Sequence, residues 1–322
     1  YKRMRPGEPA VLDTARTFFN NLFLSPRRYE LSGVGRFKMN KRLSLSIPNT
    51  PENWVLGRED IVATLRYLVK LQGGEGTVDD IDNLSNRRLR RVGELVNSQA
   101  FRVGLLRLER AVKERMSLAS TDDDVSPSVL VNARPVIAAI NEFFRSNQLS
   151  TILDQTNLLS ELDNLRRITV TGPGGISRER ASFSIRDINA SQYGRIDPVR
   201  SPEGPNIGLV TYLSLYARVN KYGFLETPYR KTLKESVGKK LRVKLTDEIV
   251  YLSADDEEEY QITDAGIHID SEGYITDEWV PIRFRGDFTE GSVELIDLVD
   301  ISPQQVVGTS ASLIPFLSND EA

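Results

Sequence analysis

The stretch GPGGISRERASFSIRDINASQYGRIDPVRSPEGPNIGL, residues 172–209, organises this sequence. Glycine and proline cluster at both of its ends and make the backbone turn at defined points. Between those turns stand Arg178, Arg180, Arg186 and Arg195. A guanidinium donates two hydrogen bonds at once and keeps its charge at any working pH, which suits phosphate. The stretch therefore predicts a rigid polyanion-binding surface or, as the plainer alternative, a turn-rich loop with solvated arginines.

Length and composition are those of a globular protein. The 322 residues predict about two domains, and 39% hydrophobic with 27% charged residues predicts a packed core. No apolar run approaches the ~20 residues that a membrane span needs. The sequence has no cysteine and a single histidine, His268, which excludes disulfides, thiolate metal sites and His-rich zinc sites.

Charge is distributed unevenly along the chain. Residues 247–322 carry 19 acidic and two basic side chains, a net charge of −17. Because the whole chain has a net charge of −3, residues 1–246 carry +14. A basic body with an acidic end is typical of a nucleic-acid-facing region beside a solvent-facing module, although the acidic end also serves as a solubilising surface.

Amphipathic helices are expected through the N-terminal half. Apolar residues recur at helical spacing within residues 11–23, 59–72, 86–118 and 135–146. Between the first two of these segments, residues 29–46 are polar and mixed, which predicts a hairpin or irregular chain. The third segment holds a large excess of basic residues and favours a polyanion or an acidic partner.

The chain becomes β-like from Leu241 onward, where short apolar runs alternate with Gly, Asp and Ser. Earlier, the alternation in residues 181–188 predicts a strand, whereas residues 148–175 match neither a clean helix nor a clean strand. The acidic run at residues 255–259 predicts a solvated loop tip. The predicted fold class is α+β: a multidomain fragment with a mainly helical N-terminal half, Gly/Pro/Arg-rich loops and a β-rich C-terminal module.

A metal site is suggested only by Asp79, Asp80 and Asp82, which stand close together. The segment lacks the glycine and the closing glutamate of a calcium loop. The P-loop, GxSxG and HExxH patterns do not occur. We therefore assign no metal ligand from the residues alone.

Motifs in a fixed order run along essentially the whole chain: YKRMRPGEP, VGRFKMNK, DDIDNLSNRRLR, QLSTILDQTN, GPGGISRERA, YGRI, SPEGPNIGL, YGFLETPYRK and QQVVGTSASLIPFL. As a set they resemble the β subunit of bacterial-type multisubunit DNA-directed RNA polymerase. That family is several times longer, and the sequence begins at Tyr1 without an initiator Met. The resemblance therefore implies an internal fragment of a longer polypeptide.

Four modules follow from the resemblance. Residues 1–88 would be part of the lobe and residues 89–148 part of the protrusion. Residues 149–225 would form the fork and the wall that faces the RNA–DNA hybrid, which is also the rifamycin-pocket region. Residues 226–322 would be the β-rich external domain.

The activity implied by the resemblance is template-directed nucleotidyl transfer, with two magnesium ions stabilising the attacking and leaving oxygens. In this family the Mg²⁺ ligands lie on the β′ subunit, so we expect no catalytic residue and no cofactor on this chain, and no activity from it in isolation. The expected partners are the β′, α and ω subunits, σ factor, double-stranded DNA and the RNA–DNA hybrid. The expected location is the bacterial cytoplasm, with a plastid as the alternative.

The resemblance also implies nucleic-acid-binding residues. The matching positions are Asp82, Arg87, Arg166, Arg167, Ile176, Arg178, Arg180, Ile185, Glu203 and Asn206. Within this set, a pocket for a downstream non-template base is matched by Asp82, Arg87, Ile176 and Ile185. There the Asp82 carboxylate could accept a hydrogen bond from a guanine edge, which explains the aspartate better than a metal does.

Rifamycin-pocket positions are matched by Thr151, Asp154, Asn164, Arg167, Thr169 and Thr171. The family usually has Gln, His, Ser and Leu at positions 151, 164, 169 and 171. Lost hydrogen bonds and the extra methyl group of Thr169 would each cost on the order of 1–3 kcal/mol, so the resemblance implies low rifamycin affinity. Arg200 departs further, because it stands where the family usually has Glu.

The alternative function is a stand-alone nucleic-acid-binding or scaffold protein derived from a polymerase module. A reading frame that continues on both sides favours the polymerase subunit, and stop codons at these ends favour the alternative. A self-sufficient metal-dependent enzyme fails because the ligands are missing.

Overall fold

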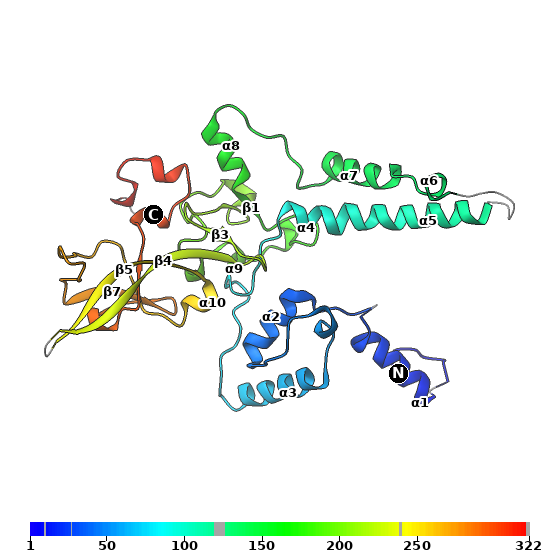
Figure 1. The fold of residues 1–322 in the computed structure, drawn as a ribbon, viewed down its shortest axis with the longest axis horizontal. Coiled ribbons are helices and arrows are strands. Elements are labelled where there is room, and N and C mark those ends of the chain that lie inside the picture. Colours follow the sequence, from blue (N-terminus) through cyan, green and yellow to red (C-terminus); the bar gives the residue numbers. More distant parts are fainter. Residues whose placement is uncertain (10, 27, 119–125, 238–239, 320–322) are drawn as a thin grey trace. The chain divides into compact units, whose positions relative to one another are not determined.

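The computed structural model describes residues 1–9, 11–26, 28–118, 126–237 and 240–319. The chain divides into two compact units, Tyr1–Asp80 and Ile81–Ala322 (Figure 1). None of the helices in the described part of the chain has the length and apolar character that a bilayer crossing requires.

The unit Tyr1–Asp80 is helical. Its helices are α1 (Leu12–Phe19), continued by a π-helical turn (Asn20–Leu24), α2 (Ser32–Leu43) and α3 (Arg58–Gln72). At the start of α3 the Asp60 carboxylate accepts a hydrogen bond from the Gly57 N–H at 2.8 Å. The helices predicted within residues 11–23 and 59–72 are thus confirmed.

An ion pair, not an apolar cluster, forms the interior of this unit. Arg36 on α2 and Asp60 on α3 are the only buried residues among those described there, at 1% and 0% exposure. Two guanidinium nitrogens of Arg36 donate to the two Asp60 carboxylate oxygens at 2.6 and 2.9 Å. The same guanidinium donates to the carbonyl oxygens of Asn53 and Val55. The pair therefore joins α2, α3 and the segment between them.

The predicted hairpin or irregular chain at residues 29–46 is wrong, because α2 occupies most of it. An amphipathic helix is recognised by an apolar stripe, but the side chain that α2 buries is Arg36. The usual periodic signal is therefore missing from the sequence.

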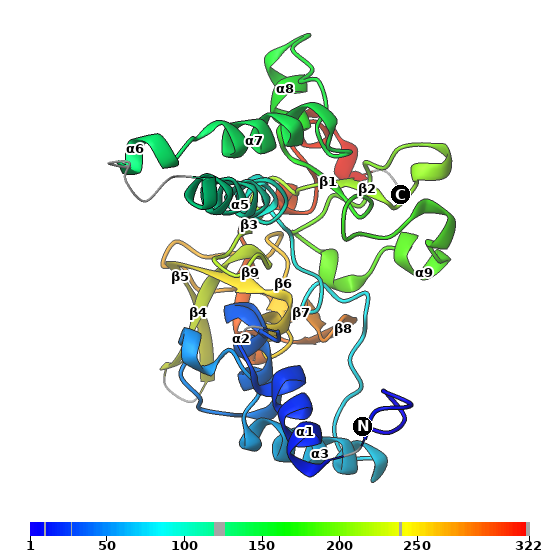
Figure 2. The ribbon, with the colours of Figure 1, turned by 90° about the vertical axis from the view of Figure 1, so that its right-hand side faces the viewer.

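The unit Ile81–Ala322 begins with a helical arm. Its elements are α4 (Val92–Val96), a π-helical turn (Asn97–Phe101), α5 (Arg102–Leu118), α6 (Pro127–Leu130) and α7 (Arg134–Ser146). Helices α5 and α7 lie side by side (Figures 1 and 2). A Cβ atom at Gly104 would come within 2.9 Å of the Val136 Cα, so glycine permits this close approach.

The rest of this unit is mainly β structure. A two-stranded sheet joins β1 (Arg167–Thr169) to β2 (Val210–Tyr212). A seven-stranded sheet has the order β3-β4-β9-β6-β7-β8, with β5 also paired to β4. Its strands are β3 (Arg218–Val219), β4 (Leu225–Val237), β5 (Lys240–Ser253), β6 (Ile262–Thr263), β7 (Trp279–Phe284), β8 (Asp287–Ser292) and β9 (Leu298–Asp300).

The predicted α+β class is confirmed, with a mainly helical first half and a β-rich last part. A further local prediction, the strand at residues 181–188, is wrong. Residues 181–188 contain a helical turn, α9 (Phe183–Arg186), and Phe183 is 87% exposed, so the alternation has no buried face. Residues 148–175 are neither one helix nor one strand, as predicted. They contain both β1 and a short helix, α8 (Leu158–Leu165), capped by the Asn157 side chain, which accepts from the Ser160 N–H at 2.7 Å.

Replacing Asp60 should destabilise the chain strongly. Asp60→Asn leaves the buried Arg36 charge without its partner, which typically costs about 3–5 kcal/mol. The loss is measured as the change in the free energy of unfolding in urea, with Glu59→Gln as the control because Glu59 is exposed on the same helix. A loss no larger than that of the control would contradict the role of the pair.

The same pair should make stability depend on pH. Burial opposes ionisation of Asp60, but the hydrogen bonds from Arg36 and Gly57 outweigh it and hold the pKa of Asp60 below its ordinary value of 3.8. A carboxyl group whose pKa is lower in the folded chain than in the unfolded chain stabilises the folded chain at any pH above its ordinary pKa. This contribution to the free energy of unfolding is lost as the pH falls through the pKa of the folded state. In Asp60→Asn, which has no carboxyl group at this position, the free energy of unfolding should no longer show this particular decrease at acidic pH.

Candidate nucleic-acid interface

A cavity of about 690 Å³ lies in the unit Ile81–Ala322 and is lined by residues from distant parts of the sequence. We name it the arginine-lined cavity, after Arg87, Arg88, Arg90, Arg167 and Arg178 in its wall. Guanidinium groups concentrated on a concave surface favour an anionic ligand. Two of these groups have carboxylate neighbours, since Arg88 pairs with Glu94 and Arg87 lies 3.8 Å from Asp82. The cavity thus presents a concave surface with an excess of cationic side chains.

Many of the predicted site residues line this cavity. From the nucleic-acid set these are Arg87, Arg167, Ile176, Arg178, Ile185 and Asn206. From the rifamycin set they are Thr151, Asn164, Arg167, Thr169 and Thr171. The fold thus brings together positions that lie more than a hundred residues apart in the sequence.

Asp82, Arg166, Arg180, Glu203 and Asp154 do not line the cavity. Asp82 remains near it, because its carboxylate lies 3.8 Å from the guanidinium of Arg87. Arg180 and Glu203 are exposed, in the short 3₁₀ turn Arg178–Arg180 and just before the turn Gly204–Asn206 respectively.

Arg166 points into the protein. Its guanidinium donates to the carbonyl oxygens of Ser214 and, at 3.3 Å, Leu215. Burial lowers the pKa of this guanidinium. Arg166 thus braces the segment after β2, and its neighbour Arg167 presents its side chain to the cavity.

Asp154 organises the entry to α8. Its carboxylate accepts hydrogen bonds from the Ser160 hydroxyl and from both the N–H and the hydroxyl of Thr156. These donors, first among them Ser160, hold the pKa of Asp154 below its ordinary value. The carboxylate is therefore used within its own loop.

The loop that begins at residue 172 is tied to both of its neighbours. Arg90 donates to the carbonyl oxygen of Pro173 at 2.7 Å, which fixes the loop from the side of the preceding basic segment. Farther along, Arg186 donates to the carbonyl oxygens of Pro205 and Ile207 at 2.8 Å each. Gly208 has φ +68°, and a Cβ there would lie 2.4 Å from the Arg186 carbonyl oxygen, so only glycine fits. The Gly/Pro-rich stretch is thus held by its own arginines.

A buried ion network anchors the same stretch to the large sheet. Arg195 is fully buried and lies 2.6 Å from the Glu257 carboxylate. Arg283, 5% exposed, lies 3.5 Å from the other Glu257 oxygen and 3.1 Å from the Asp300 carboxylate. The Tyr193 hydroxyl donates to Asp300 at 2.6 Å. Four charged groups from the stretch, α10 (Ala254–Glu257), β7 and β9 thereby neutralise one another.

Carbonyl oxygens and an aromatic ring around this network stabilise its guanidinium groups. The Arg195 guanidinium also donates to the carbonyl oxygens of Leu225 and Leu252, at 3.2 and 3.0 Å. The ring of Tyr193 lies 3.6 Å from the Arg283 guanidinium carbon. Burial, followed by the Asp300 carboxylate, raises the pKa of the Tyr193 hydroxyl, so it remains a donor.

The prediction that the acidic run at residues 255–259 is a solvated loop tip is wrong for its first part. Part of it forms α10, and Glu257 is only 14% exposed because it faces Arg195 and Arg283. The sequence showed five acids but gave no sign of which one turns inward.

Arg200 also pairs inside the chain. Its guanidinium contacts the buried Asp163 carboxylate, donates to the Ser310 hydroxyl at 2.9 Å and lies 3.9 Å from the centre of the Tyr212 ring. The arginine that replaces the family's usual glutamate at position 200 thus has a carboxylate partner, Asp163 of α8.

Arg88 and Arg90 line the cavity but were not among the predicted site residues. In the sequence they stand out only as part of the basic run after residue 86.

Within the part of the chain that the structure describes, no group of three or more His, Cys, Asp or Glu side chains is placed to hold a metal ion. The arrangement can bind and orient an anion through fixed guanidinium groups, and its polar wall adds the paired hydroxyls of Thr169 and Thr171, 2.8 Å apart.

Comparison with known proteins matches three consecutive regions. The matching families are RNA polymerase Rpb2, domain 2, over residues 1–90, RNA polymerase Rpb2, domain 3, over residues 151–219, and RNA polymerase beta subunit external 1 domain over residues 229–302.

Individual relatives match over the full chain. The DNA-directed RNA polymerase subunit beta of Bartonella tribocorum is 51% identical over 322 residues, which is 100% of this chain and 22% of the relative. That of Chelativorans sp. is 52% identical with the same coverage. That of Syntrophomonas wolfei is 51% identical, and this chain covers 28% of it. The chain therefore spans only about a quarter of the length of such relatives.

Neutralising Glu257 should destabilise the chain. Glu257→Gln leaves two nearly buried guanidinium groups facing a neutral side chain, and breaking a buried pair typically costs about 3–5 kcal/mol. Urea unfolding measures the loss. Glu259→Gln, an exposed change in the same acidic run, is the matched control and should stay within about 0.5 kcal/mol. Equal losses in both variants would contradict the network.

Proposed function

Because the chain belongs to the β-subunit family of DNA-directed RNA polymerases, we propose that it lines the main channel of such an enzyme and contacts downstream DNA and the RNA–DNA hybrid. The observation that carries this proposal is the arginine-lined cavity, which gathers cationic side chains from residues 87–90, 167 and 178. Planar, permanently charged guanidinium groups bind phosphate oxygens in pairs of hydrogen bonds.

The proposed contribution to RNA synthesis is positioning. The guanidinium groups hold the nucleic-acid backbone, and the braced loop from residue 172 keeps its shape against the strands that it faces. Rigid placement matters because fixed donors lose little conformational freedom when the ligand binds. Magnesium, which supplies charge stabilisation of the attacking and leaving oxygens, would be held by the β′ subunit. On its own this chain would not catalyse nucleotide addition.

The modules and partners belong to the same proposal. Residues 1–88 would be part of the lobe, 89–148 part of the protrusion, 149–225 the fork with the hybrid-facing wall, and 226–322 the external domain. The partners would be the β′, α and ω subunits, σ factor, double-stranded DNA and the RNA–DNA hybrid. The location would be the bacterial cytoplasm, with a plastid as the alternative.

Within this function, Asp82, Arg87, Ile176 and Ile185 would form a pocket for a base at the downstream edge. Arg87, Ile176 and Ile185 line one cavity, and the Asp82 carboxylate lies 3.8 Å from the Arg87 guanidinium. The two isoleucines offer apolar surface to a base, and Arg87 holds the aspartate near it. A carboxylate in this place can accept from the donors of a guanine edge.

Asp82→Ala should change sequence-dependent pausing and leave elongation chemistry intact. The variant is made in the complete polypeptide that carries this chain, assembled as the polymerase, and pausing is read on templates with guanine or another base at the downstream edge. The guanine-dependent difference should fall because the acceptor is lost. Asp79→Ala is the control, since Asp79 pairs with Arg42 in the other unit.

Two outcomes separate the levels of this proposal. Unchanged pausing in Asp82→Ala, with normal elongation, would contradict the base pocket alone. Absence of the polypeptide from the purified, active polymerase would contradict the function itself and favour a stand-alone nucleic-acid-binding protein.

Low sensitivity to rifamycin is expected from the cavity wall. Thr169 and Thr171 bond to each other through their hydroxyls, and Asn164 stands where the family usually has His. The double variant Asn164→His/Thr169→Ser should lower the inhibitory concentration by about tenfold or more, the equivalent of one hydrogen bond in a buried site. Thr156→Ser, outside the cavity, should change nothing. Inhibition of the unmodified polymerase at nanomolar rifamycin would contradict the expectation.

A further inference from the structure

Three strands of the large sheet lie at its margin: β3, β5 and β8. Strand β3 is two residues long. The outer side of β5 is covered by residues 273–275, through backbone hydrogen bonds of 2.9 Å at Val243 and Leu245. Among the described residues, β8 pairs with β7 alone (Figure 2). The outer N–H and C=O groups of β8, a strand of six residues, are therefore open to a further strand.

An aromatic side chain stands on this open edge. Residues 287–290 of β8 are all exposed, and Phe288 exposes 67% of its surface. Proteins usually protect sheet edges from association by charge or by short strands, and a large exposed apolar side chain does the opposite. Side chains alternate between the two faces of a strand, so Phe288 and Glu290 share one face and Asp287 lies on the other. The edge thus offers an aromatic ring and a carboxylate on each face.

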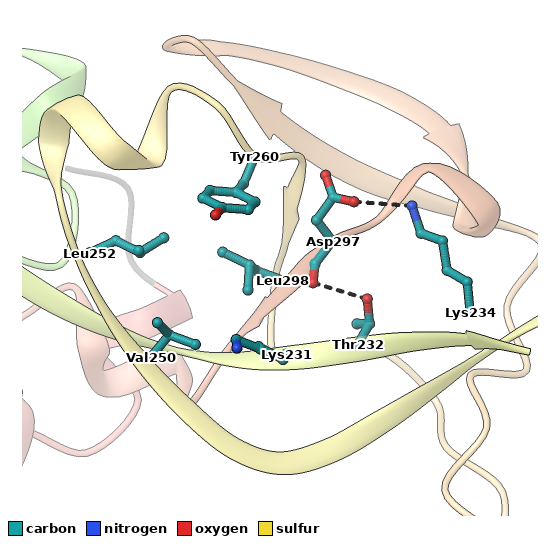
Figure 3. A pocket seen from close by; sticks show the side chains of 8 residues that line it. All are labelled: Lys231, Thr232, Lys234, Val250, Leu252, Tyr260, Asp297 and Leu298. Carbon is teal, nitrogen blue, oxygen red and sulfur yellow. Dashed lines mark hydrogen bonds and ion pairs between the residues drawn. The ribbon is translucent and has the colours of Figure 1, made fainter. Parts of the chain in front are cut away.

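Carboxylates in another part of the sheet are neutralised within the chain. At the cavity drawn in Figure 3, the Asp297 carboxylate lies 3.0 Å from the Lys234 ammonium, and Lys231 on its wall pairs with Glu248 at 2.6 Å. The charges around that cavity are balanced, so it does not select a charged partner.

The carboxylates of the β8 edge are not neutralised in this way. Four exposed acidic residues of the β7–β8 hairpin and its flanks form no ion pair with a described residue: Glu278, Asp287, Glu290 and Glu294. The hairpin has one exposed cation, Arg285, in its turn. The edge therefore keeps an excess of negative charge. None of its residues lines the arginine-lined cavity, and nothing in the proposed polymerase function uses it.

This charge decides which strand can be added. Two copies of the edge would bring carboxylates together, and nucleic acid would bring phosphates, so both are repelled. A strand that carries lysine or arginine is attracted. Its backbone would extend the ladder, as in other cases of strand addition to a sheet edge.

We propose that the outer edge of β8 binds an extended, basic segment of a partner protein as an added strand. An apolar residue of the segment packs against Phe288, and basic residues reach Asp287 and Glu290. Because these two carboxylates lie three residues apart and on opposite faces, the segment has the pattern basic–apolar–any–basic. Main-chain hydrogen bonds supply the affinity, and the carboxylates with the ring supply the selectivity.

The test uses the hexapeptide KVKKVK, acetylated, amidated and carrying a neutral fluorophore. The protein is the complete polypeptide that carries this chain, in the complex in which it is purified, and binding is measured by fluorescence anisotropy. One comparison peptide is EVEEVE, which inverts the charge. The other is KVKKVK methylated at every peptide nitrogen, which keeps the charge but cannot donate to β8. The expected result is saturable binding of KVKKVK, with both comparison peptides at least about tenfold weaker.

Variants locate the binding. Asp287→Lys and Glu290→Lys should each weaken KVKKVK by about tenfold through charge reversal. The double variant Asp287→Lys/Glu290→Lys should instead bind EVEEVE more tightly than KVKKVK. Glu272→Lys is the matched control, because Glu272 is an exposed acidic residue outside the hairpin. Thermal unfolding of each variant shows that the fold is kept.

Other results would overturn the proposal. Absence of saturable KVKKVK binding would mean that the edge is covered in the complex or is unused. Equal weakening by Glu272→Lys would mean general charge attraction. Binding of the methylated peptide as strong as that of KVKKVK would mean that no strand is added, and failure of the double variant to prefer EVEEVE would mean that Asp287 and Glu290 do not select the charge.

Discussion

The buried contact between Arg195 and Glu257 is the interaction on which the larger unit depends. Arg195 belongs to the Gly/Pro-rich stretch, and Glu257 belongs to α10 at the edge of the sheet. Arg283 and Asp300 extend the contact into β7 and β9. An uncompensated charge in such a place is very costly, so these segments stabilise one another when they come together. The network thereby fixes the rear of the stretch, whose front lines the arginine-lined cavity.

The uneven charge of the sequence has two separate uses in the structure. Some basic residues point into the fold: Arg195 pairs with a carboxylate, and Arg166 donates to carbonyl oxygens. Others, such as Arg167 and Arg178, face the cavity and give it its proposed affinity for phosphate. The acidic end contributes to the first group through Glu257. Sequence alone could not divide the arginines in this way, because adjacent residues such as Arg166 and Arg167 have opposite orientations.

The elements that could be predicted from the sequence are those with a periodic pattern of apolar residues. Helices α1, α3, α5 and α7 bury or present apolar stripes, and their spacing predicted them. Helix α2 has no such stripe because it buries Arg36, and α9 was mistaken for a strand because alternation without burial is uninformative. Most of the predicted site residues meet in one cavity, since the ordered motifs locate them. Arg90 and Glu257 escaped, because their partners lie far away in the sequence.

The interior of the unit Tyr1–Asp80 has a thermodynamic consequence. Among its described residues, the buried side chains are a guanidinium and a carboxylate, while Leu65, Leu68 and Val69 of α3 remain more than half exposed. The heat capacity of unfolding grows with the apolar area that becomes hydrated and falls with the polar area. We therefore expect this unit to have a smaller heat-capacity increment per residue than a unit with an apolar core, and a flatter stability curve.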